Sequence, residues 1–146
     1  MKFKAIELNE RSNIEVIKQC GLELLNEGIV GNSFIESCIE REHHFPTGLP
    51  VDPPVAIPHT FDPSVKESSV CYARLKKPVT FKQMYTQVDD LAVEHVFCMA
   101  LKDEHTYIDF LQKLILSIQS QNFIVQLSKC EPENLVDFLR ENLSIH

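Results

Sequence analysis

The sequence has only four glycines, which argues against one common class of phosphate site. A loop that cradles a nucleotide needs closely spaced glycines, and no such loop, Gly-x-Ser-x-Gly elbow or paired-carboxylate signature occurs. No apolar run approaches the roughly 20 residues of a membrane span, so we expect no direct membrane insertion. Basic residues are also few, with 14 Lys and Arg against 21 Asp and Glu and a net charge of −7. Because binding to nucleic acid needs clustered Lys and Arg, we do not expect a nucleic acid as partner.

The cysteines are placed in a way that argues against a redox centre. They are odd in number and far apart, without a Cys-x-x-Cys pair, at Cys20, Cys38, Cys71, Cys98 and Cys130. The first ten residues are polar and lack the apolar core of a secretory signal. We therefore expect reduced, mostly buried thiols in a cytoplasmic protein.

The histidines do not make a convincing metal site either. His43 and His44 could be combined with His59, but adjacent residues on a helix point about 100° apart. No nearby set of Cys, Asp and His has the spacing of zinc ligands. We expect neither a bound metal nor another cofactor.

The 146 residues fit a single domain, 1–146, of α/β class. Apolar residues at helical spacing predict helices at 13–27, at 33–43, from 103 or 104 to about 121, and from Glu131-Pro132 onward. Strands are predicted at 55–57, 69–75 and 93–101, while 81–86 is ambiguous and fits a short strand. Helices at both ends with strands between them predict an α/β sandwich, a mixed β-sheet flanked by helices on both faces.

The segment Val-Ala-Ile-Pro-His at residues 55–59 is the most informative feature of the chain. Its apolar part is typical of a buried strand end. Pro58 fixes its own φ and is expected to stop the ladder, which would leave His59 on a stiff backbone at the mouth of a sheet. The segment 45–54 before it is rich in proline and is expected to form a rigid loop that shapes a wall of the site. The alternative is a histidine that merely starts a loop.

Three segments together resemble a known active-site region. Arg41-Glu42, then Phe-Pro-Thr-Gly-Leu at 45–49, then the segment that ends at His59, are similar to the enzyme IIA proteins of sugar phosphotransferase systems. Within the fructose/mannitol superfamily the galactitol-like group is the best match, and the resemblance spans nearly the whole chain. It implies a fold of the kind just described. It also implies that His59 accepts a phosphoryl group on Nε2 from phospho-HPr and passes it to a cysteine of enzyme IIB.

The resemblance also assigns roles to neighbouring residues. Arg41 is the expected phosphate stabiliser, because a guanidinium binds phosphate in a fork; alternatively it is a solvated cation at a helix C-terminus. The hydroxyls of Thr47 and Thr60 could donate to phosphate or cap local turns. Glu42 could orient Arg41 or face water.

Many members of the family carry a second histidine close to the phosphorylated one. Here His105 is the candidate, although an alignment on the helix that follows puts Tyr107 at that place, and galactitol-like members can lack this histidine. His95 lies in a predicted buried strand and is expected to be a hydrogen-bonded core histidine. The residues of the site do not indicate which sugar is transported, because the resemblance implies that the sugar does not bind to this chain.

Two other functions fit the same residues. One is a regulatory protein of the same fold that is phosphorylated on His59 and signals by binding a target protein. The other is a binding domain that has lost phosphotransfer.

Overall fold

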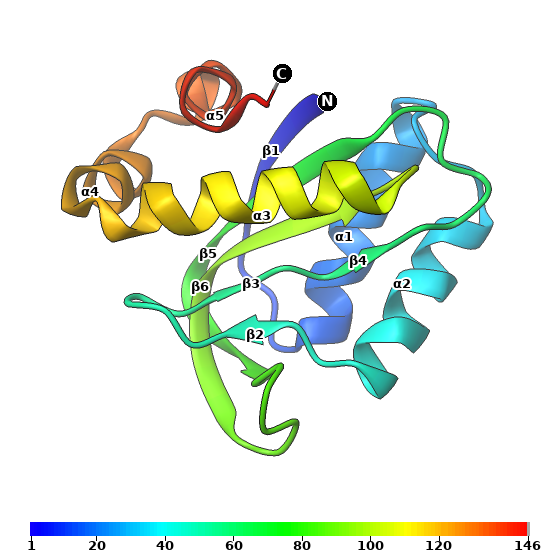
Figure 1. Ribbon diagram of the computed structural model, residues 1–146, viewed down its shortest axis with the longest axis horizontal. Helices are drawn as coiled ribbons and strands as arrows, with labels where there is room; N and C mark the ends of the chain where they lie inside the picture. The colour runs from blue at the N-terminus through cyan, green and yellow to red at the C-terminus, as the bar shows by residue number, and fades with distance from the viewer. Residues whose placement is uncertain (146) are drawn as a thin grey trace.

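A six-stranded mixed sheet lies between two layers of helices in the computed structural model, which describes residues 1–145 (Figure 1). The strand order is β1-β5-β6-β3-β2, and β4 also pairs with β6. Helices α1 and α2 cover one face of the sheet, and α3, α4 and α5 cover the other. The expected α/β sandwich with helices on both faces is therefore confirmed. The strands are β1 (Lys2–Leu8), β2 (Gly48–Leu49), β3 (Val55–Ala56), β4 (His59–Thr60), β5 (Ser69–Lys82) and β6 (Asp90–Ala100). The helices are α1 (Asn13–Asn26), α2 (Ser33–His44), α3 (Glu104–Gln119), α4 (Gln121–Lys129), a short 3₁₀ turn η1 (Pro132–Asn134) and α5 (Leu135–Leu143).

Each face of the sheet has its own hydrophobic core. On one side Ile17 and Leu24 of α1 and Phe34 of α2 pack onto β5 and β6. On the other side Phe110 and Leu114 of α3 pack with α4 and α5. The two cores exist because β5 and β6 are apolar on both faces, so a helical layer is needed on each side.

The start of the chain differs from the expectation that helices lie at both ends. Residues Lys2–Leu8 form β1, an edge strand that pairs in parallel with β5. Only Phe3 of this strand is buried, and lysines alternate with apolar residues along it. Charged residues on an edge strand interrupt the apolar pattern from which a strand is predicted. They also protect the edge from pairing with another chain.

The structure also contains one strand that is longer than predicted and one additional helix. The strand expected at 69–75 continues as β5 to Lys82, with a register shift against β6 between Arg74 and Val79. This continuation includes the first residues of the ambiguous segment 81–86. Helix α4 was not predicted, and its apolar face completes the second core through Phe123 and Leu127.

The pairing of the strand segments around Pro58 corrects a further expectation. Both β3 and β4 pair in parallel with β6, and the Met99 N–H donates to the Pro58 carbonyl at 2.8 Å. Proline lacks only its own N–H, so its carbonyl still accepts and the ladder resumes beyond it. His59 is consequently paired with Met99, one residue before the end of β6, so it lies at this end of the sheet as expected, but its side chain is only 6% exposed.

The thiols are buried, as expected for most of them. Cys20, Cys38, Cys71 and Cys98 are buried within the first core, Cys130 is half-buried, and all five are free. Within residues 1–145 no helix is long and apolar enough to cross a membrane.

Candidate active site

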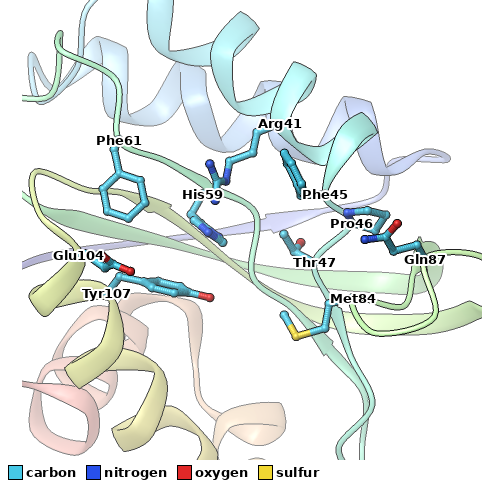
Figure 2. Close-up of a pocket in the computed structure, with 10 residues that line it drawn as sticks. All are labelled: Arg41, Phe45, Pro46, Thr47, His59, Phe61, Met84, Gln87, Glu104 and Tyr107. Atoms are coloured by element: carbon cyan, nitrogen blue, oxygen red, sulfur yellow. The ribbon is translucent and has the colours of Figure 1, made fainter.

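His59 lies in a hollow of about 240 Å³ where several segments that are distant in sequence meet (Figure 2). The end of α2 and the loop after it form one wall, and the first turn of α3 forms the opposite wall. The turn between β5 and β6 reaches the hollow because the Met84 N–H donates to the Gly48 carbonyl at 2.8 Å. The ten lining residues are Arg41, Phe45, Pro46, Thr47, His59, Phe61, Met84, Gln87, Glu104 and Tyr107.

The imidazole of His59 is held as a neutral ring with one defined tautomer. Its Nδ1 lies 2.7 Å from the Ile57 carbonyl oxygen. A carbonyl only accepts, so Nδ1 carries the proton and Nε2 keeps its lone pair. Burial lowers the pKa of His59 from 6.5 to about 4; the charge of Arg41 acts in the same direction, and the Ile57 carbonyl opposes both. At neutral pH the neutral ring can therefore act as a nucleophile through Nε2.

Aromatic rings enclose the imidazole. The ring of Tyr107 stacks on it, with centroids 4.5 Å apart and planes inclined by 26°. Phe61 meets the imidazole edge-on at 6.2 Å and Tyr107 edge-on at 6.3 Å. Burial raises the pKa of Tyr107, so its hydroxyl stays protonated near neutral pH.

Arg41 brings positive charge to the hollow. It lies in the last turn of α2, and its guanidinium carbon is 5.6 Å from the ring centroid of Phe45 and 5.8 Å from that of Phe61. Among the described residues no carboxylate pairs with Arg41, and its Nε is buried without a hydrogen-bond partner. A cation held between aromatic rings with unused donors can bind an anion.

Glu42 has neither of the two positions expected for it. Its buried carboxylate accepts the Thr47 N–H at 2.8 Å and the Thr47 hydroxyl at 2.6 Å. The Thr47 carbonyl in turn accepts the Ile57 N–H at 3.2 Å. Glu42 therefore fixes the loop wall and, through Thr47, the strand segment whose carbonyl holds His59. Burial raises the pKa of Glu42, although the two bonds from Thr47 oppose this shift.

The two threonines lie close to His59, but their hydroxyls are already engaged. Thr47 lines the hollow and donates its hydroxyl proton to Glu42. Thr60 follows His59 in β4, and its hydroxyl shares a hydrogen bond with that of Ser37 at 2.8 Å. Neither hydroxyl therefore caps a local turn: that of Thr47 bonds a buried carboxylate of α2, and that of Thr60 bonds Ser37 of the same helix.

The structure does not bring His105 to His59. Its side chain is 86% exposed, its Nε2 lies 3.1 Å from the Asp109 carboxylate, and it does not line the hollow. Asp103 caps α3 by accepting the Thr106 N–H at 2.7 Å. At about 100° per residue, a position two residues further on faces the other way, so Tyr107 is the residue that covers His59.

Of the remaining histidines, His95 has the position expected for it. His95 is buried, and its Nδ1 lies 2.6 Å from the Tyr72 hydroxyl, which confirms a hydrogen-bonded core histidine. His43 and His44 are exposed at the end of α2. In the described part of the chain, no three His, Cys, Asp or Glu side chains are arranged to hold a metal ion.

Sequence reasoning missed several residues that line the hollow. Phe61 could have been found, because it lies two residues after His59 and alternation along an extended segment predicts the same side. Met84 and Gln87 carry no such signal, since the turn between β5 and β6 reaches the hollow only through its bond to Gly48.

Comparisons with known proteins give one consistent picture. Residues 1–142 match the family model described as phosphoenolpyruvate-dependent sugar phosphotransferase system, EIIA 2. The chain is 28% identical over 114 residues to a galactitol-specific EIIA component from Escherichia coli, covering 77% of this chain and 75% of that protein. It is 29% identical over 147 residues to a mannitol-specific enzyme IIA component from Enterococcus faecalis, covering 97% and 94%. The fold is shared with the enzyme IIA of an Escherichia coli complex between mannitol enzyme IIA and phosphorylated mannitol enzyme IIB, with a TM-score of 0.72, 20% identity, and 97% and 93% of the chains covered.

Proposed function

Because the chain belongs to the EIIA 2 family of the phosphoenolpyruvate-dependent sugar phosphotransferase system, we propose that His59 is its phosphoryl acceptor. Members of this family take part in phosphotransfer that serves sugar transport. The observation that carries the assignment is the hydrogen bond of 2.7 Å between Nδ1 of His59 and the Ile57 carbonyl, which leaves Nε2 unprotonated beside Arg41. HPr is the proposed donor, and a cysteine of enzyme IIB is the proposed recipient.

The transfer is a displacement at phosphorus. The Nε2 lone pair of His59 forms a P–N bond, while the P–N bond to the phosphohistidine of HPr breaks and its electron pair returns to the HPr imidazole. The proton on Nδ1 stays in place, and the Ile57 carbonyl stabilises the positive charge that the ring gains. In the second transfer the cysteine thiolate of enzyme IIB forms an S–P bond, and the pair of the P–N bond returns to Nε2. A relay of this kind divides one transfer into two easier steps.

Arg41 is the proposed stabiliser of the transferring group. Such a group spreads negative charge over its oxygens, so catalysis depends on positioned cations and N–H donors. The unpartnered Nε of Arg41, and the fact that no carboxylate among residues 1–145 forms an ion pair with it, support this role. Thr47 contributes through its place in the loop wall, because its hydroxyl proton is already donated to Glu42.

We propose that the transport system served is a polyol system of the galactitol-like group. The name of the Escherichia coli relative supports this assignment, although a mannitol-specific relative has a similar identity. The partner assignment is supported by the fold shared with an enzyme IIA solved in complex with phosphorylated enzyme IIB. Rapid transfer to a galactitol-type enzyme IIB, faster than to a mannitol-type one, is the expected result. Phosphorylation without transfer to any enzyme IIB would favour the regulatory alternative.

The acceptor assignment is tested by intact-mass measurement after incubation with phosphoenolpyruvate, enzyme I and HPr. We expect one acid-labile phosphoryl group on the wild type and none on His59→Ala. His105→Gln is the matched control, because this exposed histidine lies outside the hollow, and it should be phosphorylated like the wild type. A folded wild-type protein that gains no phosphoryl group, or a His59→Ala protein that gains one, would refute the assignment.

A further inference from the structure

We propose that Tyr107 is the positioning residue for the acceptor, and that its ring rather than its hydroxyl performs this task. The inference rests on the proposed function, since it concerns the same histidine. Its starting point is the stack between the Tyr107 ring and the His59 imidazole, with centroids 4.5 Å apart and planes inclined by 26°.

One hydrogen bond cannot fix the orientation of an imidazole. The His59 ring is held at Cγ by its covalent bond to Cβ and at Nδ1 by the hydrogen bond to the Ile57 carbonyl, and these two attachments still allow the plane of the ring to tilt. A flat surface against one face of the ring removes this tilt. Together the carbonyl and the Tyr107 ring define the plane of the imidazole, and with it the direction of the Nε2 lone pair.

The Tyr107 ring is itself held firmly enough to serve as a reference surface. It lies in the first turn of α3, whose start is fixed by Asp103 accepting the Thr106 N–H and hydroxyl at 2.7 and 3.0 Å. The Phe61 ring is nearly perpendicular to both rings, with its centroid 6.2 Å from that of His59 and 6.3 Å from that of Tyr107, so the three rings form one cluster. In Figure 2 Arg41 and Tyr107 lie on opposite sides of His59. The guanidinium of Arg41 and the ring of Tyr107 therefore act on the imidazole from different directions.

The stack is expected to strengthen as the reaction proceeds. When Nε2 donates its lone pair to phosphorus while Nδ1 keeps its proton, the imidazole gains positive charge. The face of an aromatic ring attracts a cation, so Tyr107 stabilises the charged ring more than the neutral one. An interaction that is stronger in the transition state than in the ground state raises the rate.

The hydroxyl of Tyr107 is not needed to hold the ring. Among the described residues it makes no hydrogen bond, and Figure 2 shows it directed away from Phe61, along the hollow. Burial raises the pKa of Tyr107, so the ring adds no negative charge beside the phosphoryl group. A phenylalanine at position 107 should therefore still position His59, whereas an aliphatic residue should not.

The test compares Tyr107→Phe and Tyr107→Leu with the wild type in rapid-quench phosphoryl transfer from HPr. We expect Tyr107→Leu to lower the maximal rate by about 10- to 100-fold, the loss typical of a misplaced reacting group, with the half-saturating HPr concentration unchanged. Tyr107→Phe should stay within about threefold of the wild type, because it retains the ring. Leu116→Ala is the control: this exposed residue of α3 does not line the hollow, and the maximal rate should be unchanged.

A second measurement does not depend on phosphorylation. In proton–nitrogen NMR of the free protein, the His59 ring signals should stay single and sharp in Tyr107→Phe and broaden in Tyr107→Leu, where the ring is free to tilt. The tautomer should be the same in both variants, because the Ile57 carbonyl fixes it. A Tyr107→Leu protein that transfers like the wild type, or a Tyr107→Phe protein as slow as Tyr107→Leu, would overturn the inference. If the wild type is never phosphorylated, the proposed function fails, and the NMR comparison still decides whether Tyr107 positions His59.

Discussion

Lowering the pH from 7 to 5 should reduce the free energy of unfolding by about 4 kcal/mol, because the fold buries two neutral histidines. Burial lowers the pKa of His59 and of His95 from 6.5 to about 4. At pH 5 both rings are protonated in the unfolded chain and neutral in the folded one. The folded protein therefore binds fewer protons, and its stability falls as the pH falls.

The magnitude follows from the two pKa values. Between pH 6.5 and pH 5 each histidine loses about 1.36 kcal/mol of stability per pH unit, which gives about 2 kcal/mol for each. The loss is nearly absent above pH 7 and complete below pH 4, where the folded rings are protonated too. Glu42 acts in the opposite direction: burial raises its pKa, so its contribution becomes more favourable at lower pH. A total loss of this size is a large part of the 5–15 kcal/mol of a typical domain.

The assay is urea unfolding at several pH values between 7 and 5 for the wild type, His59→Gln and His95→Gln. Each variant should lose about half of the pH dependence, whatever its stability at pH 7, because only one titrating ring remains. His105→Gln, which removes an exposed histidine, should keep the wild-type pH dependence. The reasoning fails if His95→Gln keeps the full wild-type dependence, or if stability rises as the pH falls over this range.

Three further substitutions test other contacts. Arg41→Lys should slow phosphoryl transfer from HPr by about tenfold or more in a rapid-quench assay, because a lysine cannot reproduce the guanidinium fork. Glu42→Ala leaves the buried N–H and hydroxyl of Thr47 without an acceptor, so urea unfolding should show a loss of about 2–4 kcal/mol; an unchanged midpoint would contradict this. Gly48→Ala places a Cβ about 2.5 Å from the Lys82 carbonyl oxygen, and thermal unfolding should show a loss of about 1–3 kcal/mol; wild-type stability would mean that the turn moves freely.

The parts of the fold that sequence predicted well are those with local signals. Both ends of helix α1 lie within one residue of the prediction. Its apolar residues recur at helical spacing, and its start is fixed by a local cap in which Ser12 accepts the Glu15 N–H. Strand β6 was found from its long apolar run, which a strand buried on both faces requires. Strand β1 and helix α4 were not found, because their burial depends on elements elsewhere in the chain.

The candidate site divides in the same way. His59 and Arg41, which line the same hollow, were predicted from residues that lie close together in sequence and resemble a known family. The role of Glu42 was not predicted. This carboxylate lies near the end of α2, and the path of the following loop decides whether it faces water, Arg41 or Thr47. Tyr107 was left as an alternative to His105, because a shift of two residues in a helix start turns a side chain to the other side.

The sequence by itself determined the class of the fold, the family, and the histidine on which the chemistry is proposed to occur, since apolar periodicity and short motifs are local properties. Only the tertiary structure decided which groups surround that histidine. The Tyr107 ring, the Phe61 edge and the Met84 turn come from segments that meet through long-range packing and backbone pairing. The burial that keeps His59 neutral is likewise a property of the assembled layers, because no residue is desolvated by its sequence neighbours alone.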